Sequence, residues 1–555
     1  MRGILLLLKY HLRAAANLRR IVLRQSRFKV GFILLFAVAM LAGLWSLFLE
    51  GFRFLDSLGG VGLMLISRLF ILFFFGMGLM LMLSGVATSY TTFFRDEETS
   101  FLMLKPLTIG QVVVLKYLES AGLASWAFFF VIIPFVGSYA WYEGLPLFFS
   151  LWTFVFSVPF VLLCSGAGSI LCMILVRWLP RGRILAAGLA PLALAAAWWI
   201  WKSTGRADLG ANDTLLLLNR MIPGMKTASH PIWPSWWVAE GIMSLTRGQW
   251  ARGAMLWGVL VSNLLVVGLI VEGVGRGIFY DAWQRVISVS SRARKRAVLL
   301  RFVERLLSFV ASDMRGIVLK DMRLFLRDPA QWSQTVVFFG LLALYFLNLR
   351  HFRYNLLADQ WRNLIAFLNV FSVSAVMCSL GSRFVYPQLS LEGHGFWIVG
   401  LSPTTMGRVL VAKFGASALA MLAISVVLMV GSASMLAVQP AVQMVSLAIA
   451  VGMSCAIAGL STGLGAVFLD LENRNTAAIV SGFGGTLNLV LSLGYMIATI
   501  VPFGFVFHLK AIHQLGPAGF RSLLILAGVW GILATACSTA IPLWLGWRSL
   551  KEREY

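Results

Sequence analysis

Long apolar runs, separated by short polar connections, dominate the pattern of residues along the chain. Many runs reach about 20 residues, the length that a helix needs to cross the hydrocarbon core of a bilayer. We therefore expect an all-α polytopic membrane protein with about twelve transmembrane helices. The predicted spans are 30–49, 64–90, 112–137, 146–176, 184–201, 253–274, 330–348, 363–385, 409–436, 441–468, 477–501 and 520–546.

Basic residues indicate how these spans are oriented. If the N-terminus is cytoplasmic, most of the 46 Lys and Arg residues fall in cytoplasmic connections, as the positive-inside rule requires. An even number of spans then places both termini in the cytoplasm, and we expect a multi-pass protein of a bacterial inner membrane. The basic stretch before the first span lacks a cleavage site and predicts a helix lying on the membrane surface.

Composition supports the same class of protein. The chain has 555 residues, of which 59% are hydrophobic and 12% charged. Its formal net charge of +24 could indicate nucleic-acid binding, but the basic residues flank the apolar runs. We therefore expect the lipid bilayer, and no nucleic acid, as the partner of this charge. The five cysteines all lie in apolar runs and are interpreted as packing residues.

Two long connections carry further signals. Residues 276–312 form a basic linker that contains SRARKR and separates a first half, 1–275, from a second half, 313–555. From Met314 to Arg327, apolar and basic residues fall on opposite sides of a helix, which predicts a second surface helix. The Trp- and Pro-rich end of the connection 202–252 predicts an irregular amphipathic segment at the membrane interface.

An internal repeat relates the two halves. The stretch EETSFLMLKPLTIGQVVVLKY (97–117) resembles EGHGFWIVGLSPTTMGRVLVAKF (392–414), and each follows the second span of its half. Glu97 meets Glu392, Phe101 meets Phe396 and, after a two-residue insertion, Pro106 meets Pro403, Thr108 meets Thr405, Gly110 meets Gly407, and Lys116 meets Lys413. The chain is therefore predicted to be two six-helix repeats in parallel orientation, each preceded by an amphipathic surface helix.

Several kinds of chemistry lack support in the sequence. Ionisable residues are essentially missing at mid-membrane depth, where ion-coupled transporters usually carry them. The chain has no G-x-x-x-x-G-K-[ST] phosphate loop, so an energy source on another protein is expected. His508 and His513 lack a nearby carboxylate and the spacing of metal ligands on a helix. We therefore expect no catalytic residue and no metal ligand in this chain.

The order of elements leads to a family. A surface helix, two spans, a loop with the shared Glu, Phe, Pro, Thr, Gly and Lys, and four more spans, all repeated once, resembles the type-2 class of ABC exporter permeases. The stretches KDMRLFLRDPAQWSQ (320–334) and LDLENRNTAAIVSGFGGTLNLVLSL (469–493) are similar to permeases of this kind in which both halves are fused. The resemblance implies two copies of a separate ABC ATPase subunit, which hold ATP and Mg²⁺, whereas this chain binds no cofactor.

The resemblance also implies a site in each half. The loop after the second span forms a short coupling helix that docks in a cleft of the ATPase. Carried over by position, the contacts are Arg95, Glu97, Glu98, Phe101, Leu104, Pro106 and Thr108 in the first half, and Glu392, Phe396, Ser402, Pro403 and Thr405 in the second. The second loop departs from the first because it lacks the acidic triplet of Asp96, Glu97 and Glu98. Capping of a helix N-terminus is the alternative interpretation of that triplet, and the repeat favours coupling over it.

The path of the exported substrate is expected, by resemblance, between the second and fifth spans of each half. Candidate residues are Phe75, Ser84, Thr88, Ser372, Ser374 and Asn488, although polar residues of this kind also hold helices together. The apolar spans favour an amphipathic or lipid-like substrate. Two alternatives stay open: a membrane enzyme that acts on lipid-linked substrates, and a subunit that transmits force without transporting anything.

Overall fold

The computed structural model contains helices and no strands among its described residues. The structure describes residues 27–56, 60–94, 96–178, 229–287, 304–305, 308, 310–327, 359–436, 439–472, 479–480 and 482–552. Within these ranges ten helices are long and apolar enough to cross a membrane. The chain is therefore an all-helical protein with the character of a multi-pass membrane protein, as its hydropathy pattern predicts.

Each of these ten helices falls on a predicted span. The other two predicted spans, 184–201 and 330–348, lie outside the described residues, as does the predicted surface helix before the first span. Twelve spans in two parallel repeats thus stay a prediction. The contacts within the chain define two compact units, one of residues 1–293 with 328–348 and the other of residues 294–327 with 349–555.

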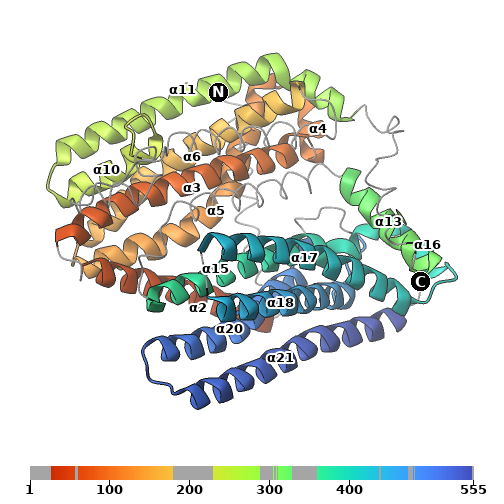
Figure 1. Cartoon of the computed structure of the whole chain (residues 1–555). Coiled ribbons are helices and arrows are strands. Elements are labelled where there is room, and N and C mark those ends of the chain that lie inside the picture. The colour runs from red at the N-terminus through yellow and green to blue at the C-terminus, as the bar shows by residue number, and fades with distance from the viewer. Residues whose placement is uncertain are drawn as a thin grey trace. The chain divides into compact units, whose positions relative to one another are not determined.

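The first unit is built from long helices that pack around aromatic residues (Figure 1). Its elements are α2 (Arg27–Asp56), α3 (Gly60–Phe94), α4 (Glu97–Met103), α5 (Ile109–Tyr142), α6 (Leu147–Trp178), α10 (Pro234–Thr246) and α11 (Trp250–Ile287). The core near one end contains Phe52, Phe70 and Phe135, whose rings lie 4.8 to 6.4 Å apart. Aromatic pairs at these distances stabilise a core beyond their buried area.

Helix α10 differs from the sequence-based expectation of an irregular segment. Pro234 occupies the first turn of a regular helix, where its missing N–H needs no partner. Val238, Ala239 and Ile242 of this helix are buried in the core of the first unit. The apolar face is thus covered by protein, and that packing explains why the segment is helical.

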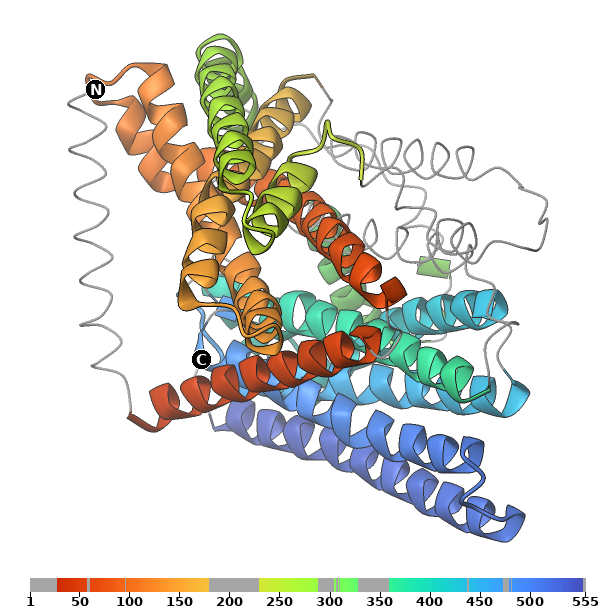
Figure 2. The same ribbon diagram turned by 90° about the vertical axis from the view of Figure 1, so that its left-hand side faces the viewer.

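The second unit has the same kind of architecture. Its helices are α13 (Ser312–Arg327), α15 (Asp359–Leu380), α16 (Phe396–Gly400), α17 (Met406–Leu436), α18 (Pro440–Val467), α20 (Phe483–Ala511) and α21 (Pro517–Lys551). Helices α20 and α21 run side by side and are joined by a short loop at one end (Figure 2). Helix α15 continues into one π-helical turn, Gly381–Val385, and two short 3₁₀ turns before α16.

Small residues let two helices of this unit approach closely. A Cβ atom at Gly463 of α18 would lie 2.3 Å from the backbone carbonyl carbon of Pro542 in α21. A Cβ atom at Gly459, one turn earlier, would lie 2.8 Å from the Cα atom of Thr539. Glycines four residues apart are a common contact surface between membrane helices, because they bring the two backbones together.

Candidate functional site

The first loop, described from Asp96 to Thr108, folds as a short helix held against its neighbours. Asp96 precedes α4, and its Oδ1 accepts a hydrogen bond from the Glu98 N–H at 3.2 Å. The hydroxyl of Thr99 donates to the carbonyl oxygen of Thr92 at 2.8 Å, which ties α4 to the end of α3. Leu102 is buried against α5. The loop is therefore a folded element with one face directed inward.

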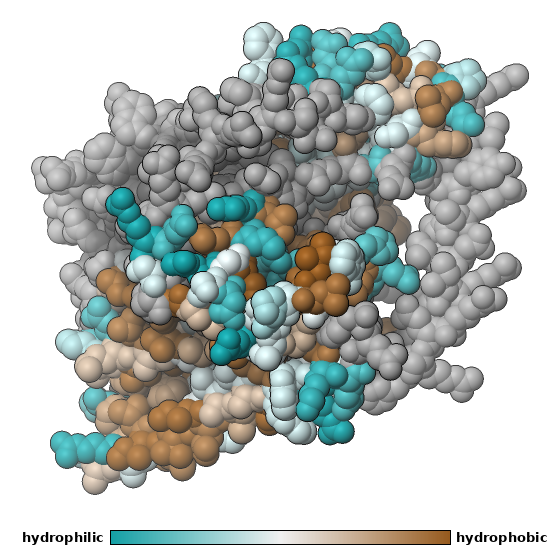
Figure 3. Space-filling model, turned by 90° about the vertical axis from the view of Figure 1, so that its right-hand side faces the viewer, coloured by the Kyte–Doolittle hydropathy of each residue, from teal (hydrophilic) through white to brown (hydrophobic). Residues whose placement is uncertain are grey.

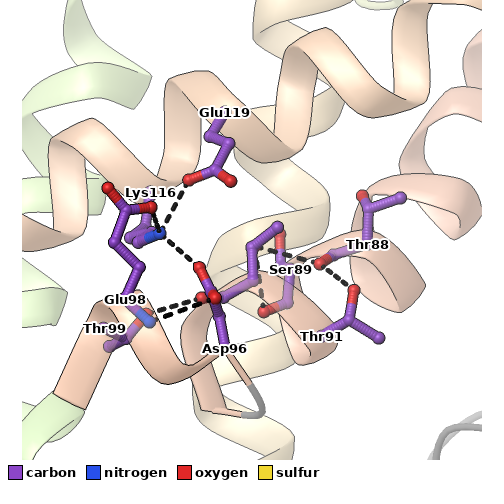
Figure 4. A network of polar contacts seen from close by, with 9 residues as sticks. Thr88, Ser89, Thr91, Asp96, Glu98, Thr99, Lys116 and Glu119 are labelled. Atoms are coloured by element: carbon purple, nitrogen blue, oxygen red, sulfur yellow. Dashed lines mark hydrogen bonds and ion pairs between the residues drawn. The ribbon is translucent and has the colours of Figure 1, made fainter. Parts of the chain in front are cut away.

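Lys116 of α5 anchors this loop (Figure 4). Its side chain is 0% exposed, and its Nζ atom lies 2.5 Å from Asp96 Oδ2, 2.7 Å from Glu98 Oε2 and 2.8 Å from Glu119 Oε2. The three carboxylates lie close enough together to hold a metal ion by geometry. Here the Lys116 ammonium group satisfies them, since a buried cation is stable only when it is paired and hydrogen-bonded.

Asp96 has two roles at once. One carboxylate oxygen caps the N-terminus of α4 and the other accepts from Lys116. The capping interpretation of the acidic triplet is thus confirmed for Asp96, and the ion cluster is an addition that the sequence did not indicate. Glu97 begins α4, but its side chain lies outside the described part of the chain, as does Arg95.

The outer face of the first loop is apolar and exposed. Leu104 is 85% exposed and Phe101 is 57% exposed. The Nζ atom of Lys105 lies 4.4 Å from the centre of the Phe101 ring. Pro106 and Thr108, which follow, are also exposed, and Thr108 caps α5 in a reciprocal hydrogen-bond pair with Gln111.

The second loop, residues 389–405, also has a buried inner side and an exposed apolar outer face, but its backbone differs from that of the first loop. Gly393 has a φ of 55°, a conformation that a residue with a Cβ atom rarely adopts, and it redirects the chain into α16. The side chain of Phe396 then points inward and packs with Leu389 and Leu410. The outer face consists of Trp397, Ile398 and Leu401, all of which are exposed.

Lys413 of α17 anchors the second loop. Its side chain is 1% exposed, and its Nζ atom lies 2.7 Å from Asp321 Oδ2 and 3.0 Å from Glu392 Oε1. Lys320 also forms an ion pair with Glu392. Lys116 follows the first residue of α5 by seven positions, and Lys413 follows the first residue of α17 by seven. The repeated lysine therefore has the same place and the same kind of partner in both halves.

A second ion pair joins α13 to α17 nearer their ends. Arg408 Nη1 lies 3.3 Å from Asp313 Oδ2. The Met314 backbone N–H, followed by the Arg408 guanidinium, holds the pKa of the Asp313 carboxyl below its usual range. Because this pKa is lowered by folding, the contribution of Asp313 to stability is present above the ordinary pKa of an aspartate and is lost as the pH falls through the lowered value.

The structure corrects the alignment of the two loops around α16. Phe396 is 1% exposed, so its side chain is not part of the outer surface on which it was expected. A constant offset of 297 positions matches Leu104 with Leu401, which is 76% exposed, and matches Phe101 with the exposed Ile398. With this offset, exposed residues of the first loop match exposed residues of the second. The two extra residues therefore lie before α16, at the turn around Gly393.

The remaining predicted residues of the second loop lie at its end. Pro403 and Thr405 are exposed, and the Thr405 carbonyl oxygen accepts the first hydrogen bonds of α17. The Ser402 hydroxyl donates to the carbonyl oxygen of Val399 at 2.7 Å. Hydrophilic and apolar residues lie side by side on the end of the molecule where α13 and α16 appear in Figure 1, as the space-filling view shows (Figure 3).

Three charged residues of the anchors were not assigned to the site from the sequence alone. They are Glu119, Lys320 and Asp321. For Asp321 a signal was present: it follows Ile317 by four residues and Met314 by seven, which places a carboxylate within the apolar face of a surface helix. A charge in that position indicates a buried partner.

Two of the six predicted path residues, Thr88 and Asn488, form hydrogen bonds between helices. The Thr88 hydroxyl lies 2.8 Å from the Ser120 hydroxyl, which joins α3 to α5. Asn488 donates to the Ser461 hydroxyl at 3.1 Å, and its buried Oδ1 has no hydrogen-bond partner in the described part of the chain. The Phe75 ring packs edge-on against Trp233.

Three serines complete the set of path candidates. Ser84 is half-buried, and its carbonyl oxygen accepts from the Thr88 hydroxyl at 2.9 Å. The Ser372 hydroxyl donates to the carbonyl oxygen of Leu368 at 2.9 Å, and Ser374 is buried. The hydrogen bonds of Ser84 and Ser372 lie within single helices and do not by themselves outline a path.

Comparison with known families identifies the chain. A family model described as "Putative ATP-binding cassette" matches residues 22–555. The match covers nearly the whole chain, and the chain belongs to this family. No curated protein and no solved structure matched it. Together with the ten apolar helices, membership of this family fits a membrane component of an ABC system.

Proposed function

We propose that this chain is the membrane-spanning permease subunit of an ATP-driven ABC exporter. The observation that carries the proposal is the pair of loops, each with an exposed apolar tip and each anchored to the next long helix by a buried lysine. A surface of this kind suits docking and force transmission, because the tip can bind a partner while the anchor moves the helix behind it.

ATP hydrolysis belongs, in this proposal, to two copies of a separate ABC ATPase subunit that bind ATP and Mg²⁺. The lack of a phosphate-loop motif in the sequence supports a division of labour between subunits. ATP binding would draw the two loops together and product release would separate them, which alternately opens a path between the halves. In this proposal the chain lies in the lipid bilayer of a bacterial inner membrane, with both termini in the cytoplasm.

An amphipathic or lipid-like substrate is the class that we propose for export. The spans are apolar and provide few charged groups to a polar solute. A membrane enzyme that acts on lipid-linked substrates would need a cluster of polar groups at one face of the membrane. The described residues do not favour this alternative. A subunit that only transmits force would use the same loops, so transport of labelled phospholipid in proteoliposomes separates that alternative from an exporter.

Copurification of the chain with an ATPase subunit tests the proposal. Leu104→Glu and Leu401→Glu place a carboxylate at each exposed tip, where it cannot enter an apolar pocket without losing water. We expect an ATPase to copurify with the unmodified chain, and about tenfold less of it to copurify with the double variant. Gln249→Glu, which adds the same charge in the loop between α10 and α11, is the matched control.

A result of either of two kinds would contradict this function. The first is that no ATPase subunit copurifies with the unmodified chain when neighbouring genes are expressed with it. The second is that the double tip variant retains as much ATPase as the Gln249→Glu control. The proposal would then lose its docking surface.

A further inference from the structure

The second anchor joins three elements of the second unit: the second loop, α13 and α17. Lys413 of α17 binds Glu392 in the second loop and Asp321 in α13, and Lys320 of α13 also binds Glu392. In the first unit the carboxylates around Lys116 come from the loop itself and from α5. The acidic group that the second loop lacks is thus supplied by a surface helix far away in the sequence.

Helix α13 is fixed at two points along α17. Asp313 and Asp321 are separated by about 12 Å along α13, and Arg408 and Lys413 by about 7.5 Å along α17, at 1.5 Å per residue. Asp313, Ile317 and Asp321 follow one another at intervals of four and share a face of the helix. Two contacts on one face fix both the position and the rotation of α13 against α17.

The segment before Glu50 cannot supply the first loop with a carboxylate of this kind. Residues 1–49 contain no Asp or Glu, so no element before Glu50 can supply a carboxylate to Lys116. Glu119, which lies one turn after Lys116 on α5, takes the third position around the lysine instead. The corresponding position in α17 is Ala416, which has no charge.

We infer that Asp321 is a positioning residue that makes α13 part of the moving unit of the second loop. The inference rests on the proposed function of the loops. The paired charges have little exposure, so their attraction is weakly screened and the link resists bending. A displacement of the second loop by its ATPase would therefore displace α13 together with α17.

Hydrogen–deuterium exchange of the full chain tests the link directly. Asp321→Asn keeps the shape of the side chain but removes its charge, and we expect roughly tenfold faster amide exchange along α13. Asp321→Glu keeps the carboxylate and should retain most of the protection. Glu119→Gln is the matched control in the first anchor, and it should speed exchange in α4 but leave α13 as it is.

A second measurement distinguishes a positioning role of Asp321 in coupling from a purely structural role. In the complex with its ATPase, Asp321→Asn should lower ATP hydrolysis severalfold while the amount of copurified ATPase stays constant, and Asp321→Glu should restore hydrolysis. Unchanged exchange in α13 would overturn the link. Faster exchange with unchanged hydrolysis would overturn the positioning role. If the unmodified chain binds no ATPase, the proposed function fails, and the exchange experiment still decides the α13 link.

Discussion

A buried ammonium group is the unit that both halves share at the scale of single residues. Lys116 and Lys413 are fully or almost fully buried near the start of their helices, and each holds the loop that precedes it. Each lysine is followed four residues later by a buried serine, Ser120 or Ser417. The repeated lysine is therefore an internal anchor, and the exposed surface of each loop is provided by apolar residues.

The two anchors should differ when their lysine is removed. Lys116→Met leaves three carboxylates without their shared cation, which we expect to destabilise the fold by about 3 kcal/mol. This is the low end for a buried ion pair, because all three carboxylates keep some contact with water. Lys413→Met should cost less, since Lys320 continues to neutralise Glu392 and lies 3.7 Å from Asp321.

Thermal unfolding followed by tryptophan fluorescence in detergent measures this difference. Arg521→Met removes an exposed positive charge and provides the baseline. A larger loss of stability in Lys413→Met than in Lys116→Met would show that Lys320 does not compensate, and the charge distribution described for the second anchor would have to be abandoned.

Close backbone contact between helices acts at the scale of elements. The pair of α18 and α21 depends on Gly463, where an added methyl group would meet backbone atoms of Pro542 that cannot move aside. Gly463→Ala should therefore destabilise the second unit by roughly 1–3 kcal/mol through overpacking. The effect should appear as a lower unfolding temperature of the purified chain.

Gly528 of α21 is the matched control for this prediction. A Cβ atom at this position would meet nothing within 4 Å, so Gly528→Ala should change stability by no more than about 0.5 kcal/mol. If both alanine variants behave alike, the glycine contact between α18 and α21 does not determine stability, and the packing of larger side chains must.

The orientation of the spans is a prediction at the scale of the whole molecule. The distribution of Lys and Arg places the first loop in the cytoplasm and the turn between α5 and α6 outside it. In a chain that carries Cys537→Ser, a cysteine at Lys105 should react with a membrane-impermeant maleimide only after permeabilisation. A cysteine at Glu143 should react in intact cells. The reverse pattern would invert the topology and remove the loops from any cytoplasmic ATPase.

Much of the fold was predictable because burial in a membrane leaves a local signal. A helix that crosses a bilayer must be apolar along about 20 residues, and the ten described helices of this kind lie where the sequence placed them. The loop positions were also predictable, since Pro106 and Pro403 repeat in a polar connection. The helical state of α10 was not, because it depends on the core against which the helix packs.

The sequence by itself determined the class of protein, the positions of the described spans and the repeat that joins Lys116 to Lys413. Only the tertiary structure decided which groups surround these lysines, which face of each loop is exposed and why the second loop needs fewer acids of its own. The physical reason is that periodicity reports the average environment of a residue, whereas an ion pair depends on its particular neighbours. Asp321 precedes Lys413 by 92 residues, and only packing brings them within 2.7 Å.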